Sequence, residues 1–374
     1  MPSGKMVVLH VVNSLDPGGM ENGIVNLSHA LEGKGIEFHI ACLERRGKFA
    51  ERLASPERVT ILGKGNGFSP RSSWRLARLI ARLRPDIVHS HNLGPLIYAG
   101  LATLGGRTCV LLHGEHSQLT AEERSPRRLL QRRWLYRACR VVHTVSRNMA
   151  FELGALGLQP GKIIPISNGV DTRRFEPGER LAARRILGLP ADAICIGIIG
   201  RFGPFKRHLE LIDAFEKISM QIPAARLVIA GGGGSEEGAV TRRVEGSPVR
   251  ERIDLLGFQS DPVRCYQALD LLAVPSANEG LSNAILEAMA CAVPALARSG
   301  CGHEQIIASG EDGWIAEMET PDRLAAKLAE ILGDRAHLVA CGPKAREKVK
   351  LHFSIASMID SYESLYRTNA ESPR

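Results

Sequence analysis

The sequence has few aromatic residues: Phe, Trp and Tyr together make up 5% of 374 residues. This scarcity argues against a surface on which bases stack, so we expect no nucleic-acid partner. No apolar run reaches the ~20 residues that a bilayer-spanning helix needs. The chain also starts with a strand-like segment, 6–12, and lacks a cationic start with an apolar signal core. We therefore expect a cytoplasmic protein that is soluble or peripheral at the inner membrane face.

Paired cysteine motifs are absent as well. The eight Cys residues are scattered singly, with no CxxC spacing, and several lie inside apolar runs, as Cys195 does. Such residues are usually small core side chains in a reducing compartment. The sequence therefore predicts neither a disulfide framework nor a thiolate zinc site.

Positive charge is what the chain has in excess, because 48 Lys and Arg residues outnumber 40 Asp and Glu residues, for a formal charge of +8. Two interpretations stand side by side. The excess is either an Arg-rich surface of solvated helices, or an attraction to phosphates on a nucleotide, a lipid carrier or an anionic membrane.

Short apolar runs alternate with helix-length amphipathic segments, a pattern that indicates parallel sheets covered on both faces. The runs are 6–12, 38–43, 86–89, 109–113, 141–145 and 162–166, then 194–199, 226–230, 253–256, 271–274 and 294–297. A break rich in Pro, Gly, Asn and Asp separates the two series at 166–178. We predict an α/β protein with two doubly wound, Rossmann-like domains, 1–170 and 171–353, and a last helix at about 354–370 that packs back on the first. Ligands of such sheets bind beyond the carboxyl ends of the strands, so we expect the active site in a cleft between the domains.

Two polar clusters follow strands of the second series. Arg201 and Lys206 flank a Gly-Pro turn after the strand 194–199, where two cations can straddle a diphosphate and stabilise a departing phosphate. Glu279 lies on the loop after 271–274, and Glu287 lies in the helix that Ser282 or Asn283 caps. Two carboxylates with helix N–H groups between them suit a sugar nucleotide: one for sugar hydroxyls, the other for ribose hydroxyls. The alternatives are an exposed basic loop and two solvated acids at a helix start.

A third cluster, Gly18-Gly19-Met20-Glu21, opens the first helix. Glycines there let the backbone approach a ligand, and the helix N-terminus favours an anion.

Together with Asp86-Ile87-Val88-His89-Ser90-His91, Gly200-Arg201 with Lys206, and Glu279-Gly280-Leu281 through Glu287-Ala288-Met289-Ala290, these motifs resemble the large retaining glycosyltransferase family 4 (group 1), which has the GT-B fold. The stretch 13–26 is most similar to the exosortase (PEP-CTERM) exopolysaccharide-associated members.

The resemblance implies a retaining glycosyltransferase that moves a sugar from a nucleoside-diphosphate sugar to a glycan or lipid-linked acceptor, in cell-surface or exopolysaccharide synthesis. It implies that Arg201 and Lys206 hold the pyrophosphate, that Glu279 binds the transferred sugar, and that His113 lines the sugar pocket. The implied donor-binding positions are Gly18, Gly19, Gly200, Phe258, Gly280, Leu281, Ser282, Asn283 and Glu287. The chain has no Asp-x-Asp pair of the kind that metal-dependent sugar transferases use, so we expect no metal and no cofactor.

Three further features have competing interpretations. The run Gly231-Gly232-Gly233-Gly234 superficially resembles a dinucleotide fingerprint, but position 236 is Glu where that spacing needs Gly. His89 and His91 on one strand face, with His113 and His116 nearby, could bind a metal, but without carboxylate or Cys ligands we interpret them as hydrogen-bonding residues. The Arg-rich segment Arg124–Arg140 fits either an anionic membrane surface or a helix whose Leu and Trp stripe packs on the sheet.

Two other functions remain open for the same fold. A GT-B sugar-nucleotide epimerase would release free nucleotide without an acceptor product, and a non-catalytic nucleotide-sugar binding protein would bind without turnover.

Overall fold

The structure is a computed structural model that describes residues 5–104 and 109–371. The chain forms two compact units, the first made of Met1–Asn168 with Ala356–Arg374 and the second of Gly169–Ile355. In the part of the chain described, no helix combines the length and apolar character that a bilayer-spanning segment needs.

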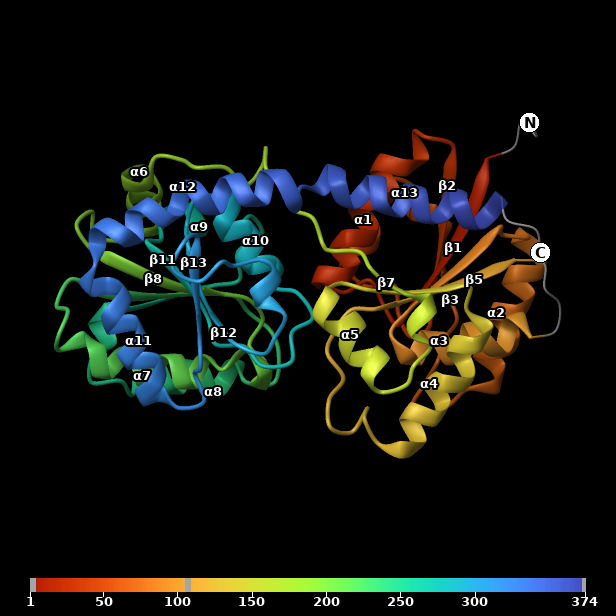
Figure 1. Cartoon of the computed structure of the whole chain (residues 1–374), viewed down its shortest axis with the longest axis horizontal. Helices are drawn as coiled ribbons and strands as arrows, with labels where there is room; N and C mark the ends of the chain where they lie inside the picture. The colour runs from red at the N-terminus through yellow and green to blue at the C-terminus, as the bar shows by residue number, and fades with distance from the viewer. Residues whose placement is uncertain (1–4, 105–108, 372–374) are drawn as a thin grey trace. The chain divides into compact units, whose positions relative to one another are not determined.

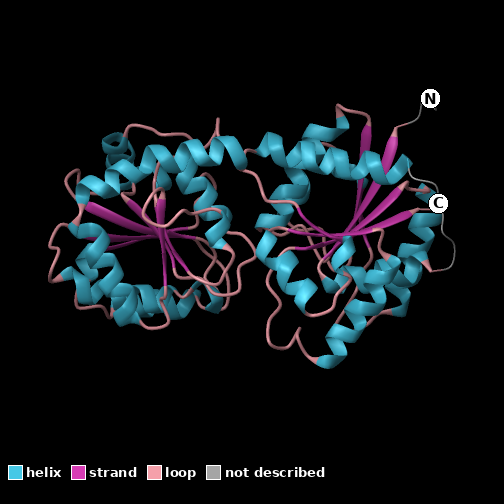
Figure 2. Ribbon diagram, in the orientation of Figure 1, coloured by secondary structure: helices cyan, strands magenta, loops and turns pink. Residues whose placement is uncertain are grey.

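The first unit contains a seven-stranded parallel sheet in the order β3-β2-β1-β4-β5-β6-β7, with helices over both faces (Figures 1 and 2). Its strands are β1 (Met6–Val12), β2 (Ile36–Cys42), β3 (Val59–Ile61), β4 (Ile87–His91), β5 (Val110–Glu115), β6 (Val141–Thr144) and β7 (Ile163–Pro165). Its helices are α1 (Gly19–Glu32), α2 (Pro70–Leu83), α3 (Leu93–Thr103), α4 (Pro126–Ala138), α5 (Arg147–Ala155) and α13 (Ile355–Glu371).

The second unit contains a six-stranded parallel sheet in the order β10-β9-β8-β11-β12-β13. Its strands are β8 (Ile194–Ile199), β9 (Ala225–Ala230), β10 (Ile253–Gly257), β11 (Leu271–Val274), β12 (Ala295–Arg298) and β13 (Gly313–Ala316). Its helices are α6 (Arg180–Leu187), α7 (His208–Ser219), α8 (Glu237–Glu245), α9 (Val263–Ala268), α10 (Asn283–Ala290), α11 (Pro321–Gly333) and α12 (Arg335–His352).

Both sheets reverse their winding direction at one point, between β1 and β4 in the first unit and between β8 and β11 in the second. This order is that of a Rossmann-like sheet, and ligands of such sheets bind outside the carboxyl ends of the strands at the reversal. The predicted fold class of two doubly wound parallel sheets is confirmed. The loops after β8 and β11 are therefore the place to search for a site in the second unit.

Buried apolar strands are what hold each sheet between its helices. The central strand β8 is almost entirely buried, and its Ile196 and Ile198 belong to a core cluster with Leu211 and Phe215 of α7. In the first unit, Leu9 and Val11 of β1 belong to a separate cluster that reaches α2, α3 and α4. Each unit therefore has its own core, as expected from the two series of strands.

Helix α4 contradicts one of the two interpretations of its Leu and Trp residues, the one in which they pack on the sheet. Leu130 is 67% exposed and Trp134 is 52% exposed, so the stripe that these residues form does not pack on the sheet. The buried face instead carries Arg132, Leu135 and Tyr136. Arg132 is fully buried, although it belongs to the Arg-rich set of this helix.

Candidate functional site

The carboxyl ends of β8 and β11 bring two of the predicted loops together in the second unit. These strands pair in parallel, so the loop 200–207 after β8 and the loop 275–282 after β11 leave the sheet on the same edge. A backbone hydrogen bond ties them, because the Ala277 N–H donates to the Phe205 carbonyl oxygen at 2.8 Å. Lys206 and Glu279, which are 73 positions apart along the chain, thereby become neighbours.

Lys206 and Glu279 form an ion pair across these two loops. The carboxylate is 12% exposed and the ammonium group 33% exposed, so the pair is partly accessible at the surface. Burial opposes ionisation of Glu279, but Lys206 and His303 together outweigh it and hold the pKa of this carboxyl below its usual range. His303, from the loop after β12, places its Nε2 atom 3.9 Å from Glu279 Oε2. The sequence did not point to His303, because only the strand order places β12 beside β11.

Glu287 is held by a different neighbour. Its Oε2 atom accepts a hydrogen bond of 2.6 Å from the hydroxyl of Tyr266, a residue of α9 that is 1% exposed. Burial raises the pKa of Glu287 to about 7, although the Tyr266 hydrogen bond and Arg174 both act to lower it. A carboxyl group that is half ionised near neutral pH is typical of a ligand-binding position. Tyr266, too, was not found from the sequence.

Arg201 lies on the same loop as Lys206 but is exposed. Its side-chain stem passes over Gly234, since a Cβ on that glycine would come within 3.2 Å of Arg201 Cγ. The glycine run after β9 therefore has a packing role. A Cβ on Gly231 would lie 1.8 Å from the Gly200 carbonyl oxygen, and a Cβ on Gly234 would lie 2.1 Å from that of Phe202. These glycines let the loop after β9 come into contact with the loop after β8.

The remaining predicted donor-binding positions of the second unit also lie at strand ends. Phe258 follows β10 and is 68% exposed, and a Cβ on Gly232 would come within 3.1 Å of Phe258 Cβ. Leu281 is 7% exposed and Ser282 is 2% exposed, while Gly280 is buried. Ser282 is the N-cap of α10, and its side chain makes no capping hydrogen bond. The roles given to these residues stay predictions.

At the start of α1, the predicted anion site meets the chain's own carboxylate. Gly18 is the N-cap and Gly19 the first residue of the helix. A Cβ on Gly18 would come within 2.3 Å of Glu21 Oε2, so the Glu21 side chain lies directly against this glycine. The helix N-terminus is thus already next to a negative charge, which the helix dipole favours.

His113 does not present a surface to a ligand in this structure. It is 0% exposed on β5, with Nδ1 3.0 Å from the Ser90 hydroxyl and Nε2 3.3 Å from Glu115 Oε1. The same carboxylate oxygen accepts hydrogen bonds from Arg132 at 2.9 Å and from Tyr136 at 2.7 Å. The geometry therefore gives His113 a place in a buried polar network, and its implied role in lining the sugar pocket stays a prediction.

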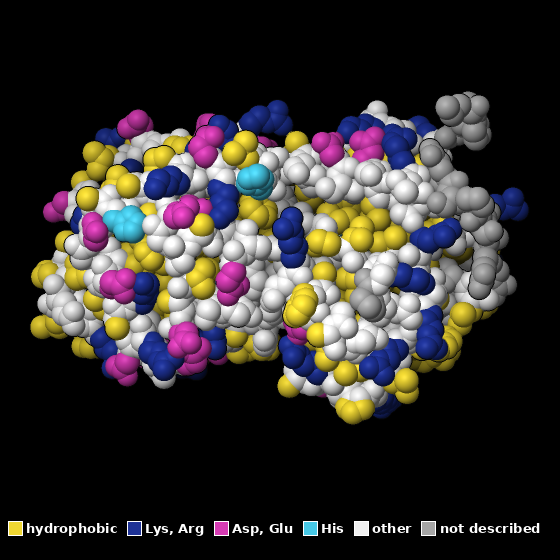
Figure 3. Space-filling view, viewed as in Figure 1, with side chains coloured by type: hydrophobic (Ala, Val, Ile, Leu, Met, Phe, Trp, Pro, Cys, Tyr) yellow, Lys and Arg dark blue, Asp and Glu magenta, His cyan; other side chains and the backbone are white. Residues whose placement is uncertain are grey.

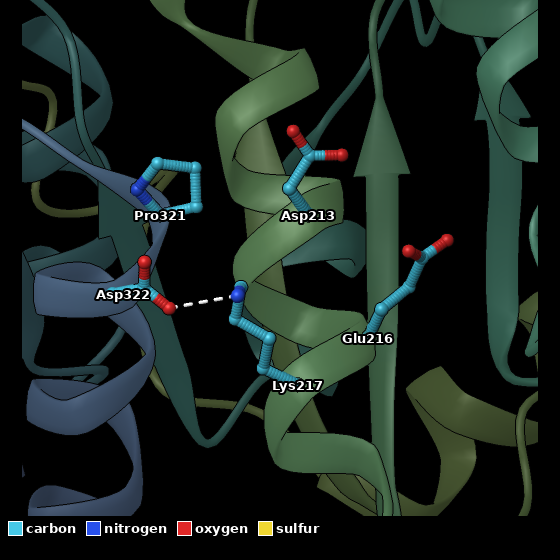
Figure 4. A pocket seen from close by; sticks show the side chains of 5 residues that line it. All are labelled: Asp213, Glu216, Lys217, Pro321 and Asp322. Carbon is cyan, nitrogen blue, oxygen red and sulfur yellow. Dashed lines mark ion pairs between the residues drawn. The ribbon is translucent and has the colours of Figure 1, made fainter.

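The second unit also has a surface depression between α7 and the start of α11 (Figure 4). Asp213, Glu216, Lys217, Pro321 and Asp322 line it. Lys217 Nζ lies 2.7 Å from Asp322 Oδ1, so an internal ion pair occupies part of the wall. None of the lining residues comes from the strand-end loops, and the depression is therefore separate from the candidate donor site.

Comparisons with known proteins agree with the fold and with glycosyl transfer. The family model described as Glycosyltransferase Family 4 matches residues 17–174, and the model described as Glycosyl transferases group 1 matches residues 179–348. The chain is 27% identical to D-inositol 3-phosphate glycosyltransferase 2 of Catenulispora acidiphila, over 91% of this chain and 87% of that protein. It is 27% identical to UDP-Gal:alpha-D-GlcNAc-diphosphoundecaprenol alpha-1,3-galactosyltransferase of Escherichia coli, over 78% of this chain and 77% of that protein.

Among solved structures, the complex of Anabaena Alr3699/HepE with UDP-glucose is similar to this chain, with a TM-score of 0.86. The match covers 97% of this chain and 100% of that one at 19% identity, and this likeness concerns the fold. The two family models lie one on each unit and together cover most of the chain. The chain belongs to the group 1 glycosyltransferases with the GT-B fold, and it is an enzyme that transfers glycosyl groups.

Proposed function

We propose that the enzyme moves a sugar from a nucleoside-diphosphate sugar to a glycan or lipid-linked acceptor with retention of the anomeric configuration. The observation that carries this proposal is the ion pair between Lys206 and Glu279 at the reversal point of the second sheet. A cation and an anion side by side suit a ligand that has a diphosphate at one end and sugar hydroxyls at the other.

In the proposed donor complex, Lys206 turns from Glu279 to the diphosphate, joined by the exposed guanidinium of Arg201. Both cations then stabilise the negative charge that grows on the leaving diphosphate as the bond to the anomeric carbon breaks. Glu279, released from the ion pair, accepts hydrogen bonds from the hydroxyls of the transferred sugar. Glu287 accepts those of the ribose, and Phe258 borders the base.

The proposed transfer step uses these positions. The acceptor hydroxyl oxygen attacks the anomeric carbon on the face that the diphosphate leaves, so the configuration is retained. The proton of the acceptor hydroxyl goes to the departing phosphate oxygen. Two cationic side chains supply the charge compensation, and we propose that this step needs no metal ion or other cofactor.

The names of similar proteins support donor and acceptor classes without fixing either. Alr3699/HepE is crystallised with UDP-glucose, and the Escherichia coli protein is named for transfer from UDP-Gal to a diphosphoundecaprenol-linked sugar. We propose a UDP-sugar donor and an acceptor carried on a glycan or a lipid diphosphate. The resemblance of residues 13–26 to exosortase-associated members supports a proposed role in exopolysaccharide synthesis.

We also propose that α4 meets the anionic membrane that carries such an acceptor. Leu130 and Trp134 are exposed one helical turn apart, and Arg127, Arg133 and Arg137 are exposed around them. Figure 3 shows Lys and Arg side chains beside hydrophobic ones over the part of the first unit where α4 lies. Exposed Trp and Leu within a ring of Arg are typical of helices that lie on anionic lipid.

Vesicle sedimentation tests the membrane proposal. The wild type should sediment with phosphatidylglycerol vesicles and not with phosphatidylcholine vesicles, and the Leu130→Ser/Trp134→Ser variant should lose this binding. Met220→Ser, which changes an 80% exposed residue of the second unit, is the matched control. Equal binding of all three proteins would contradict the role of α4.

A thermal-shift screen against UDP-, GDP- and ADP-sugars tests the proposed donor. We expect one base to raise the melting temperature clearly above the others. The product made with that donor should then have the same anomeric configuration as the donor by NMR coupling constants. Inverted product, or free nucleotide released with an epimerised sugar and no acceptor product, would refute the proposal.

A further inference from the structure

The interior of the first unit contains a cluster of histidines that the transfer reaction does not use. His10 lies on β1, and His89 and His91 lie on the neighbouring strand β4, where His10 is in register with His89. Because side chains alternate along a strand, these three imidazoles project from one face of the sheet. Their exposed fractions are 0%, 0% and 2%. This face of a Rossmann-like sheet is ordinarily apolar, so the cluster requires an explanation.

The three histidines bring their nitrogens to one place. Each residue offers one ring nitrogen, and these atoms all lie within 4.8 Å of one another. His10 Nδ1 and His91 Nε2 are 2.9 Å apart. Nitrogens bound at about 2.0–2.1 Å to one tetrahedral Zn²⁺ are roughly 3.3 Å apart, so a small rotation of two rings opens room for an ion.

The second nitrogen of each ring has a separate partner. The pairs are His91 Nδ1 with His116 Nε2 at 2.9 Å, His89 Nε2 with His143 Nε2 at 3.0 Å, and His10 Nε2 with the Tyr366 hydroxyl at 3.4 Å. A metal-bound histidine almost always donates its other N–H to an acceptor, which fixes the tautomer and the ring orientation. With these outer partners, the nitrogens that face an ion are Nδ1 of His10, Nε2 of His91 and Nδ1 of His89, the last of which gives up its 3.0 Å contact with the Tyr366 hydroxyl.

We propose that His10, His89 and His91 bind a late first-row divalent ion such as Zn²⁺ in the core of the first unit. Three imidazole nitrogens suit zinc and its neighbours, whereas Mg²⁺ and Ca²⁺ prefer oxygen ligands. The ion joins β1 to β4 and, through the Tyr366 hydroxyl, to helix α13. It therefore stabilises the fold of the first unit and takes no part in sugar transfer.

The rival explanation is a chain of neutral rings that only hydrogen-bond to one another. In this explanation the Tyr366 hydroxyl is part of the hydrogen-bonded row, because it also lies 3.0 Å from His89 Nδ1. In the metal-bound arrangement His143 carries its proton on Nδ1, an atom with no hydrogen-bond partner among the described residues. In the rival explanation the hydrogen bond between His143 and His89 runs in the opposite direction, so His143 Nδ1 carries no proton and no donor is left unpaired there. The two explanations therefore differ in what they predict for metal uptake.

Metal analysis of the full-length protein separates them. After loading with Zn²⁺ and exhaustive dialysis, the wild type should retain one ion per chain and melt at a higher temperature than the chelator-treated protein. His10→Asn/His91→Asn should retain none and show no such rise, whereas His352→Asn, a change at an exposed histidine of the second unit, should behave as the wild type. Chelation should leave the initial rate of transfer unchanged below the melting range.

A spectroscopic arm uses the wild type alone, so it stands even where the double variant fails to fold. Loading with Co²⁺ should produce the intense visible bands of a four-coordinate ion with nitrogen ligands, and one equivalent of Zn²⁺ should abolish them. Wild-type protein that takes up neither ion, or that binds Co²⁺ with only the weak bands of an octahedral ion, would overturn the proposal and favour the hydrogen-bonded chain.

Discussion

Replacing Glu287 with Gln should make the protein more stable and should lower its affinity for the donor. The carboxyl of Glu287 has an ordinary pKa of 4.5 and a pKa of about 7 in the folded protein, mainly because of burial. As pH rises from 4.5 to 7, the unfolded chain releases this proton while the folded chain keeps it. The group therefore favours unfolding increasingly across this window, and the effect is constant above it.

The size of the effect follows from the two pKa values. Their difference of about 2.5 corresponds to about 3 kcal/mol, because one pKa unit equals about 1.4 kcal/mol at room temperature. Gln does not ionise and still offers an oxygen to the Tyr266 hydroxyl. The difference in unfolding free energy between Glu287→Gln and wild type should therefore grow from about 1 kcal/mol at pH 5 to about 3 kcal/mol at pH 8.

Urea denaturation at several pH values measures this difference. Trp314 is 6% exposed in the second unit, whereas Trp74 and Trp134 lie in the first, so a Trp74→Phe/Trp134→Phe background lets fluorescence follow the second unit. The Glu330→Gln control removes a carboxylate that is 65% exposed on α11. Its unfolding free energy should differ from that of wild type by at most about 0.5 kcal/mol, as is usual for a surface substitution.

A second variant tests the cause of the shift. Tyr266→Phe removes the hydrogen bond that acts to lower the pKa of Glu287, so the loss of stability with rising pH should extend above pH 7. Donor affinity should fall in Glu287→Gln, because an amide accepts fewer hydrogen bonds from ribose hydroxyls than a carboxylate does. A pH-independent difference between Glu287→Gln and wild type would refute the reasoning about burial.

Two further substitutions test the packing in each unit. Gly234→Ala should lower the unfolding free energy by about 1–3 kcal/mol and weaken donor binding, because this glycine has a φ of +98° and the added methyl would press on a backbone oxygen. The control in parallel melts and donor titrations is Gly203→Ala, because an added Cβ there would meet no described atom within 4 Å. Arg132→Met should lower the unfolding free energy by about 3–5 kcal/mol because it leaves Glu115 buried without its cation. The exposed Arg137→Met should change it by at most about 0.5 kcal/mol in the same denaturation series, and equal costs for the two Arg variants would contradict the buried pair.

Most strands could be predicted from their apolar runs, but the edge strands β3 and β13 could not. The runs at 194–199 and 271–274 coincide with β8 and β11 because buried parallel strands are continuous in apolar residues. The strands β3 and β13 were not predicted. The first has three residues, of which Ile61 is 47% exposed, and the second begins with Gly313, so neither forms a long apolar run.

The orientation of α4 could not be predicted for a related reason. Its Arg and Leu residues are distributed around the whole helix, so periodicity does not distinguish the buried face from the exposed one. The buried face is set by Glu115, whose carboxylate lies at the end of β5 and binds Arg132. A long-range ion pair of this kind leaves no local pattern in the sequence.

The site could be predicted in part, because motifs locate residues at strand ends but not their partners. The sequence indicated Lys206 and Glu279 separately, and the pairing of β8 with β11 makes them neighbours. Tyr266 and His303 were missed because their closeness to the two carboxylates depends on α9 and on the loop after β12. The histidine cluster was recognised only in part, since His10 joins it through the strand order.

The central claim is that Arg201 and Lys206 hold the diphosphate of one sugar nucleotide. Isothermal titration calorimetry with the nucleoside diphosphate and monophosphate of the selected base tests it most directly. Arg201→Ala and Lys206→Ala should each reduce the preference for the diphosphate by roughly tenfold or more, as expected for the loss of a charge-assisted contact. Lys217→Ala, which changes the surface ion pair with Asp322, should keep the full preference. An unchanged preference in both Arg201→Ala and Lys206→Ala would contradict the account.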